Sequence, residues 1–415
     1  MADATDTLEL TRPVAEPAEV PQALTAPPRE LTTRRLLTID ALRALAAISV
    51  MVHHLPPFTG PLAPLRPWQA IGFIGVGLFL VLSGFSVHYK WALKRDHVAL
   101  DQRAFWRRRF TRLYPSYLVA AIIAAAVAGA AGAIDHPVTA WSSGDAHLPW
   151  AAAWASQALV LGANIVPVPV LFISWTIALE FQLYGAYAVV AATVRRFDPV
   201  KIVLWALAIT LAWRLASQLV VTSVSASGFL PSGRSPLESR FLYSQMPARC
   251  FEWFLGLLAV EAFVGNVRLP RWTGKLVIPA ALLLAIGVFE RHPLGALSLN
   301  GHHFMLSDVA FDPLVGLAFF VLINWFVARE DAPLLTRRWN GRPLRFAAFL
   351  GLFSYSIYLV HETVFVAWRT WLGWHSPAAI VVEAIVAVFV SWLFYLAVER
   401  HFLKRGRRID AAATR

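Results

Sequence analysis

The chain has 415 residues, of which 58% are hydrophobic and only 15% are charged, and its formal net charge is +12. Soluble domains carry about 25% charged residues, so this composition excludes an ordinary soluble globular protein. The positive charge does not indicate a nucleic-acid partner, because the basic residues gather in short segments between apolar stretches, as in the cytoplasmic loops of membrane proteins.

The first 35 residues differ from the rest of the chain in composition. They begin with acidic residues, contain five prolines and lack the apolar segment of a secretory signal. This composition predicts a disordered cytoplasmic tail over residues 1–35. Residues 36–404 are expected to form one membrane domain, and residues 405–415 a short basic cytoplasmic tail.

Apolar stretches recur along the chain and predict ten transmembrane helices, since about 20 apolar residues cross the hydrocarbon core. The expected spans are Leu37–Leu55, Ala70–Tyr89, Tyr114–Ala133, Leu171–Val194, Ile202–Thr222, Gln245–Val264, Leu276–Phe289, Asp308–Ala328, Phe346–Leu372 and Ala378–Phe402. The apolar stretch Trp150–Ile165 is interpreted as interfacial or re-entrant. The expected fold is an all-α, polytopic bundle of about ten spans in the inner (plasma) membrane, in contact with membrane lipid.

Basic residues indicate how these spans are oriented. They lie before the first span, in the second, fourth, sixth and eighth loops, and after the last span, whereas the intervening loops are poor in bases. Loops rich in Lys and Arg stay in the cytoplasm. Both termini are therefore expected in the cytoplasm, and counting Trp150–Ile165 as a full crossing would break this alternation.

The first span carries an arginine and a histidine that share a helix face. Arg43 and His54 are eleven positions apart, so they point the same way and lie roughly 16 Å apart along the axis. His53 points about 80° away from that line. Ionisable groups inside a span usually face a cavity or a partner, and an imidazole there suggests proton transfer. Asp40 and Arg43 are three residues apart and can pair at the cytoplasmic end of the helix. The alternative is that Arg43 is a snorkelling residue at the flank of the span and that His54 lies at the interface.

The second span and the loop after it carry a glycine pair and a run of arginines. Gly77 and Gly84 are seven residues apart, a spacing that predicts close helix packing, and Ser83 beside them is either a packing or a site residue. Arg109 and Arg112 close the arginine-rich loop. Guanidinium groups bind phosphate oxygens bidentately, so this loop is a candidate phosphate clamp. It could equally set the topology and contact lipid headgroups.

Two later spans carry polar residues at helical spacing. In the fourth span, Glu180 lies near the expected middle of the bilayer and is a functional candidate, or else a buried hydrogen-bonding group that ties helices together. In the ninth span, Ser354, Tyr358 and His361 form one stripe that must face protein or water. Each of them could equally line a site or tie helices together. Asp308 and Asp312 could bind sugar hydroxyls or simply be solvated, and the roles of Arg249 and Glu252 are similarly ambiguous. His292, His302 and His303 show no ligand spacing, so no metal is expected.

Together these motifs resemble the acyltransferase 3 family of integral-membrane acyltransferases, over nearly all of Leu37–Phe402. The likeness is carried by Arg43 with His54, Ser83-Gly84, Arg109 with Arg112, Trp175 through Tyr184, Ser354 through His361, and Glu399-Arg400. Three positions depart from the family pattern. Phe181 replaces a common second acid, Glu362 stands where an apolar or aromatic residue is common, and His401 replaces a common proline.

The resemblance implies transfer of an acyl group, commonly acetyl, from cytoplasmic acyl-CoA (acetyl-CoA) to a hydroxyl of a carbohydrate or glycan-type acceptor, as in polysaccharide modification. Some members carry an extracytoplasmic esterase-like domain, and because this chain ends at Arg415 we expect the membrane domain to act alone.

Acyl transfer needs a base, a site for oxyanion charge and a held leaving group. We expect His54 to be the base or the carrier of the acyl group, and Arg43 to orient the donor or stabilise negative charge. Arg109 and Arg112 would hold the CoA phosphates. The remaining candidates would line the acceptor side or tune His54: Glu180, Ser83, Ser354, Tyr358 and His361. We expect Glu180 to share one water-accessible cavity with His54 and His361, so that the first, fourth and ninth spans converge on one site. The competing class is a membrane transporter or flippase for a glycan or lipid.

Overall fold

The structure is a computed structural model that describes most of the predicted membrane domain. The described residues are 35–93, 100–132, 138–139, 147–148, 174–191, 198–226, 242–291, 296–299, 302–330, 341–373 and 376–404, with the single positions Ala155, Gln157 and Leu159. The two predicted tails lie outside these residues except for Arg35, as does most of Trp150–Ile165.

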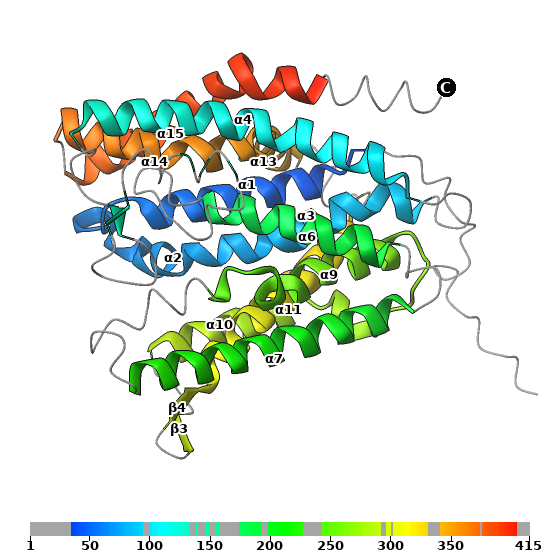
Figure 1. Ribbon diagram of the computed structural model, residues 1–415. Helices are drawn as coiled ribbons and strands as arrows, with labels where there is room; N and C mark the ends of the chain where they lie inside the picture. Colours follow the sequence, from blue (N-terminus) through cyan, green and yellow to red (C-terminus); the bar gives the residue numbers. More distant parts are fainter. Residues whose placement is uncertain are drawn as a thin grey trace, which may run out of the picture. The chain divides into compact units, whose positions relative to one another are not determined.

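The described residues form a bundle of helices (Figure 1). The helices are α1 (Leu37–His54), α2 (Arg66–Ile71), α3 (Gly75–Ala92), α4 (Gln102–Ala130), α6 (Ser174–Val190), α7 (Pro199–Ala226), α9 (Met246–Phe263), α10 (Val277–Arg291), α11 (Leu306–Val327), α13 (Gly341–Leu352), α14 (Ser354–Trp371) and α15 (Pro377–Phe394). A π-helical turn, Tyr395–Glu399, follows α15. Each of the ten predicted spans coincides with one of these helices or with the pair α13 and α14.

Among the described residues, six helices are long and apolar enough to cross a membrane, or seven if the bent pair α13 and α14 counts as one span. The other predicted spans are helical but shorter or more charged. Helix α6 has 17 residues and α10 has 15. Helix α9 carries Arg249, Glu252 and Glu261 within its 18 residues. The chain is thus a helical membrane protein, whereas the count of ten spans and the cytoplasmic termini remain predictions.

Helix α1 packs against α3, α13 and α14, and α9 packs against α3, α7 and α11. Figure 1 shows α1, in blue, between α3 and the pair α13 and α14. The contact between α3 and α9 depends on two glycines, because a Cβ on Gly84 would overlap the carbonyl of Trp253 and a Cβ on Gly256 would overlap the carbonyl of Val81. The predicted role of Gly84 in close packing is confirmed. A Cβ on Gly77 would come within 2.7 Å of the side chain of Val315 on α11, a less severe overlap.

The arginine-rich segment is helical, which corrects its assignment to a loop. Helix α4 begins at Gln102, because the side chain of Asp101 caps it by accepting a hydrogen bond from the backbone N–H of Ala104 (3.0 Å). The predicted span began only at Tyr114. Arg109 and Arg112 therefore project from a continuous helix that also contributes the third span.

The predicted ninth span is broken. Helices α13 and α14 meet at Phe353 with a bend of 67°. Gly351, just before the bend, lies so close to α1 that a Cβ would overlap the carbonyl of Asp40. Helix α13 thus follows α1, and α14 starts at Ser354 in a new direction that places the polar stripe of the ninth span.

Two short antiparallel hairpins accompany the helices and modify the all-α prediction. Strand β1 (Val138–Thr139) pairs with β2 (His147–Leu148), with Val138 opposite Leu148. Strand β3 (Ala296–Leu299) pairs with β4 (His302–Met305), with Ala296 opposite Met305. Both hairpins lie between helices, so the membrane part remains helical.

Candidate active site

A cavity of about 140 Å³ opens between helices α1, α3, α4, α6 and α14. The first, fourth and ninth predicted spans therefore converge on one site, as the sequence predicted. The polar residues that line it are Arg43, Ser83, Ser86, Arg109, Arg112, Thr176, Glu180, Tyr184, Ser354, Tyr355 and Tyr358. Seven of the nine predicted site residues lie in this lining, and His54 and His361 do not.

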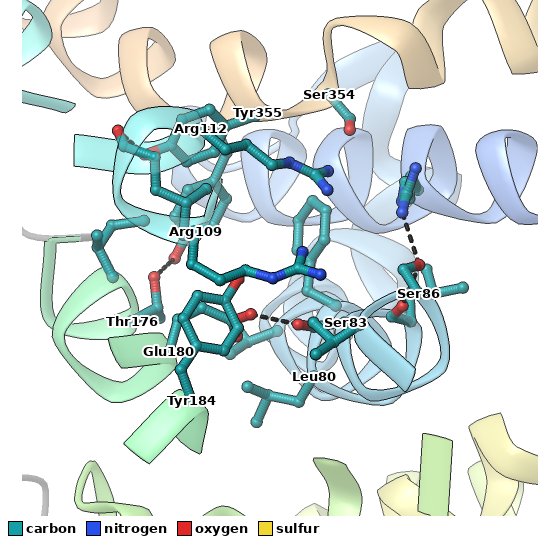
Figure 2. Close-up of a pocket in the computed structure, with 18 residues that line it drawn as sticks. Leu80, Ser83, Ser86, Arg109, Arg112, Thr176, Glu180, Tyr184, Ser354 and Tyr355 are labelled. Atoms are coloured by element: carbon teal, nitrogen blue, oxygen red, sulfur yellow. Dashed lines mark hydrogen bonds between the residues drawn. The ribbon is translucent and has the colours of Figure 1, made fainter. Parts of the chain in front are cut away.

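Helix α4 directs two arginines into the cavity. Arg109 and Arg112 are three residues apart and share one face of the helix, and Figure 2 shows both guanidinium groups extending into the cavity. The guanidinium carbon of Arg109 lies 5.5 Å from the ring centroid of Phe105 and 5.6 Å from that of Tyr184. Its buried Nε has no hydrogen-bond partner among the described residues. The two rings thus position the guanidinium group of Arg109, and its Nε–H remains available to donate a hydrogen bond to a ligand.

Arg43 of α1 supplies the third guanidinium group. Its Nη1 lies 3.1 Å from Oδ1 of Asp40, and its Nη2 donates a hydrogen bond of 2.6 Å to Oγ of Ser86. Asp40 also pairs with Arg35, at 2.5 Å. Ser86 was not predicted from the sequence, although its spacing of three from Ser83 on the same helix could have indicated it.

Glu180 faces the cavity, as predicted, and it bonds to a neighbouring helix. Ser83 Oγ donates a hydrogen bond to Glu180, as Figure 2 shows, and Nε1 of Trp253 donates to Ser83 Oγ at 3.2 Å. One turn before Glu180, the hydroxyl of Thr176 lies 2.8 Å from that of Tyr358. These contacts connect α6 with α3 and α14, so the alternative interpretation of Glu180 as a tie between helices also describes part of its role.

The charges of the cavity lining are unbalanced. Three arginines face a single carboxylate, Glu180. Asp40 neutralises part of the charge of Arg43 but is shared with Arg35. Inside a bundle of apolar helices an excess of positive charge is costly unless an anion offsets it. The cavity is therefore suited to an anionic ligand, with phosphate or carboxylate groups that guanidinium groups bind well.

His54 belongs to a second polar cluster. Its Nδ1 lies 2.9 Å from Nε2 of His361, and its Nε2 lies 3.6 Å from Oε1 of Glu362. Arg43 and His54 do leave α1 on one face, but only Arg43 reaches the cavity. The expectation that His54 and His361 line the same cavity as Glu180 is thus wrong, because neither histidine is part of its lining. Tyr358 joins the two regions, because it lines the cavity and its ring centroid lies 6.1 Å from that of His361.

The same three residues are the one described group whose ligand atoms converge as those of a metal site do. One ligand atom each of His54, His361 and Glu362 lies within 4.8 Å of the others. The two imidazoles bond to one another in the structure, with nitrogens 2.9 Å apart. The histidines weighed as metal ligands from the sequence are different ones. His302 and His303 lie on β4, and His292 is outside the described residues.

Three of the ambiguous charged residues, Asp312, Arg249 and Glu252, form a closed cluster elsewhere. The fourth, Asp308, is exposed, and only its backbone carbonyl joins the cluster, by accepting from Nε of Arg214 at 3.0 Å. Asp312 accepts from Nη1 of Arg214 at 2.5 Å and lies 3.2 Å from Nη1 of Arg249, and Arg249 also pairs with Glu252, with Nη2 2.9 Å from Oε1. Asp312 is therefore neither solvated nor placed in the cavity. Arg214, which the sequence did not single out, completes the cluster; no local spacing indicates a partner 98 residues away.

The family model described as an acyltransferase domain matches residues 36–396. The chain therefore belongs to this family, which confirms the resemblance to the acyltransferase 3 family.

Individual relatives agree with this. An acyltransferase of Streptomyces mycarofaciens, MdmB, is 29% identical over 271 residues, which is 62% of this chain and 64% of that protein. The peptidoglycan O-acetyltransferase OatA of Listeria monocytogenes is 37% identical over 90 residues, covering 21% of this chain and 12% of the relative. A putative O-acetyltransferase of Staphylococcus aureus is 30% identical over 82 residues, covering 20% and 12%. The chain spans less than two thirds of the length of these relatives. No solved structure matches it.

Proposed function

We propose that this member of the acyltransferase domain family is an integral-membrane O-acyltransferase. It would move an acyl group, with acetyl as the first candidate, from acyl-CoA to a hydroxyl of a carbohydrate or glycan-type acceptor. The plasma membrane is its expected location, with both termini in the cytoplasm. The observation that carries the proposal is the cavity in which Arg43, Arg109 and Arg112 face one carboxylate.

The excess of arginines supports an acyl-CoA donor. CoA carries phosphate groups, and a guanidinium group binds phosphate oxygens through two parallel hydrogen bonds. The buried Nε of Arg109, which has no partner among the described residues, would donate to such an oxygen. Arg107, two residues earlier on α4, is exposed and does not line the cavity. The two arginines of the family motif are thus the ones that would meet the donor.

The histidine cluster supports a general base next to the donor site. Acyl transfer to a hydroxyl requires that the hydroxyl lose its proton as its oxygen attacks the thioester carbonyl carbon. His54 would accept this proton, and Arg43 would orient the donor or stabilise the negative charge on the carbonyl oxygen. Tyr358, which lines the cavity and lies next to His361, would mark the boundary between donor and acceptor regions.

The relatives support the choice of acceptor class. The name of the Listeria protein states O-acetyl transfer to peptidoglycan, a glycan polymer with free hydroxyls. Its match covers 21% of this chain, so the acceptor of this protein is inferred at the level of the functional group, a hydroxyl, and of a carbohydrate or glycan-type molecule.

Release of free thiol from acetyl-CoA by the purified protein in detergent tests the proposal. The wild type should release CoA thiol in the presence of acceptor, and His54→Ala should reduce release to background. His53→Ala is the matched control, because its imidazole bonds to the backbone carbonyl of Gln69 (3.0 Å) and not to the cluster. A transporter or flippase, the other class considered, would bind a substrate without releasing thiol.

The acceptor can then be identified by mass spectrometry of glycans from a strain that lacks the protein. Loss of an acyl group from one glycan, restored by the wild type and not by His54→Ala, is the expected result. Unchanged glycans, together with no thiol release, would contradict the proposed function.

A further inference from the structure

The hydrogen bonds around His361 determine which of its nitrogens carries hydrogen. His361 is fully buried, with 0% of its surface exposed, and its Nδ1 lies 2.9 Å from the backbone carbonyl of Ile357. A carbonyl oxygen only accepts hydrogen bonds, so Nδ1 must carry the hydrogen. A neutral imidazole with a hydrogen on Nδ1 has a free lone pair on Nε2. His361 therefore presents an acceptor toward α1.

The same reasoning extends to His54. Its Nδ1 lies 2.9 Å from Nε2 of His361, which is a hydrogen-bond distance. Since that Nε2 is an acceptor, Nδ1 of His54 must donate. Neutral His54 then has its free lone pair on Nε2, and the chain of bonds from Ile357 through His361 leaves no other tautomer.

Glu362 lies on the side to which this lone pair belongs. Its Oε1 is 3.6 Å from Nε2 of His54, beyond hydrogen-bond distance but within the range of an ion pair. The glutamate follows His361 directly on α14. It occupies a position where members of the acyltransferase 3 family commonly have an apolar or aromatic residue. A carboxylate there gains attraction when His54 takes up a proton.

The end of α1 is held in place independently of this cluster. Arg369 of α14 donates a hydrogen bond of 2.8 Å from Nη2 to the backbone carbonyl of His54, and its Nε lies 3.5 Å from Oε1 of Glu383 on α15. The backbone of His54 is thus fixed by Arg369, while the orientation and tautomer of its ring are fixed by His361.

We propose that Ile357, His361 and His54 form a hydrogen-bonded relay in which His361 is a positioning residue that makes Nε2 of His54 the proton acceptor, and that Glu362 stabilises the imidazolium that forms. The inference rests on the proposed function and assigns the side from which the acceptor approaches. The reacting hydroxyl reaches His54 next to Glu362, whereas the donor binds in the arginine-lined cavity.

The proton transfers balance. The acceptor O–H bond breaks and its proton moves to Nε2 of His54, while the oxygen forms a bond with the acyl carbon. The C–S bond of the thioester then breaks, and the departing thiolate takes the proton from His54. The base ends neutral, with its hydrogen again on Nδ1, so the relay is ready for the next turnover. The arrangement resembles serine hydrolases, in which a third group holds the catalytic histidine in the correct tautomer.

Two substitutions at one position test the relay. In His361→Gln the side-chain carbonyl can still accept from Nδ1 of His54, whereas in His361→Leu nothing can. We expect His361→Leu to lower kcat by about 10²- to 10⁴-fold, the usual contribution of general acid–base catalysis, because the base then loses its orienting partner. His361→Gln should retain activity within about 10-fold of the wild type. The KM for acetyl-CoA should change less than about 3-fold in both variants, since His361 does not line the donor cavity.

Glu362→Gln tests the second part of the proposal. Removing the charge while keeping the shape should lower kcat by about 10-fold, corresponding to about 1.4 kcal/mol, without raising the KM for acetyl-CoA. His53→Gln, next to His54 but outside the relay, is the matched control and should stay within about 2-fold of the wild type.

The outcomes separate the relay from the proposed function. Equal loss of kcat in His361→Gln and His361→Leu, or full activity in both, would overturn the relay while wild-type thiol release still supports acyl transfer. Full activity in Glu362→Gln would remove the role of the carboxylate alone. Absence of thiol release by the wild type would instead contradict the proposed function itself.

Discussion

Two clusters of arginines and acids meet different faces of α3, and they differ in charge balance. On one face, the cavity brings Arg43, Arg109 and Arg112 together with Glu180. On the face that carries Gly77, the closed cluster pairs Arg214 and Arg249 with Glu252 and Asp312. In the closed cluster two positive charges meet two negative charges at ion-pair distance.

The comparison teaches that residue type does not separate structural from functional charges in this protein. Buried arginines and acids occur in both clusters, and all are costly in an apolar bundle. A neutral set of direct pairs needs no ligand. A cavity with excess positive charge does, especially one with a guanidinium nitrogen that has no hydrogen-bond partner among the described residues. We therefore expect the two clusters to respond differently to substitution.

The largest effect should come from breaking the closed cluster. Asp312→Asn leaves two guanidinium groups with one carboxylate in a buried site, where the side chain of Arg214 is only 3% exposed. Loss of one partner of a buried ion pair costs about 3–5 kcal/mol. We expect a strongly reduced yield of folded protein and a lower apparent Tm in detergent. A normally folded Asp312→Asn protein that binds acetyl-CoA poorly would assign the closed cluster to the donor site.

The next effect should be on donor binding. Arg109→Ala or Arg112→Ala should raise the KM for acetyl-CoA by about 10- to 100-fold, because a hydrogen bond to a charged group contributes about 1.5–3 kcal/mol. The apparent Tm should change little, since the cavity does not need Arg109 for charge balance. Arg107→Ala, on the exposed side of α4, should leave KM unchanged. Unchanged acetyl-CoA affinity in both cavity variants, measured by calorimetry, would restore a purely topological role to these arginines.

Glu180→Gln should act in the opposite direction on the donor. Removing the single acid of the lining increases the positive charge of the cavity, so acetyl-CoA should bind about 2- to 5-fold more tightly, as expected for about 0.5–1 kcal/mol between partly exposed charges. Glutamine can still accept the hydrogen bond from Ser83, so the fold should persist. We expect kcat to fall by about 10-fold because the carboxylate is lost. Weaker acetyl-CoA binding in this variant would argue against an anionic donor in the cavity.

The smallest effect should come from Arg35, at the edge of the arginine-lined cavity. Arg35 pairs with Asp40, but half of its side chain is exposed. Exposed ion pairs contribute about 0.2–1 kcal/mol. Arg35→Ala should therefore lower the apparent Tm slightly, and added salt should reduce the difference from the wild type. A large loss of activity in this variant would place the functional boundary farther out than the cavity lining.

Local properties of the chain were readable from the sequence. Hydropathy located every predicted span on a helix, because burial of backbone in hydrocarbon requires helices and apolar side chains. Helical spacing placed Arg43 and His54 on one face and identified the stripe from Ser354 to His361. Motif content identified the family. Two features were missed: the Asp101 cap, a local signal that starts α4 early, and the bend at Phe353.

The amino-acid sequence alone thus established the class of protein, its helices and the candidate site residues. Which of those residues meet depends on how the helices pack. This packing placed Glu180 beside Ser83 and Arg109, separated His54 and His361 from the cavity, and closed Arg249 onto Asp312 and Arg214. The physical reason is that hydropathy and spacing depend on neighbours along the chain. Contacts between polar faces depend instead on how closely whole helices approach, as at Gly84 and Gly256, which are far apart in sequence.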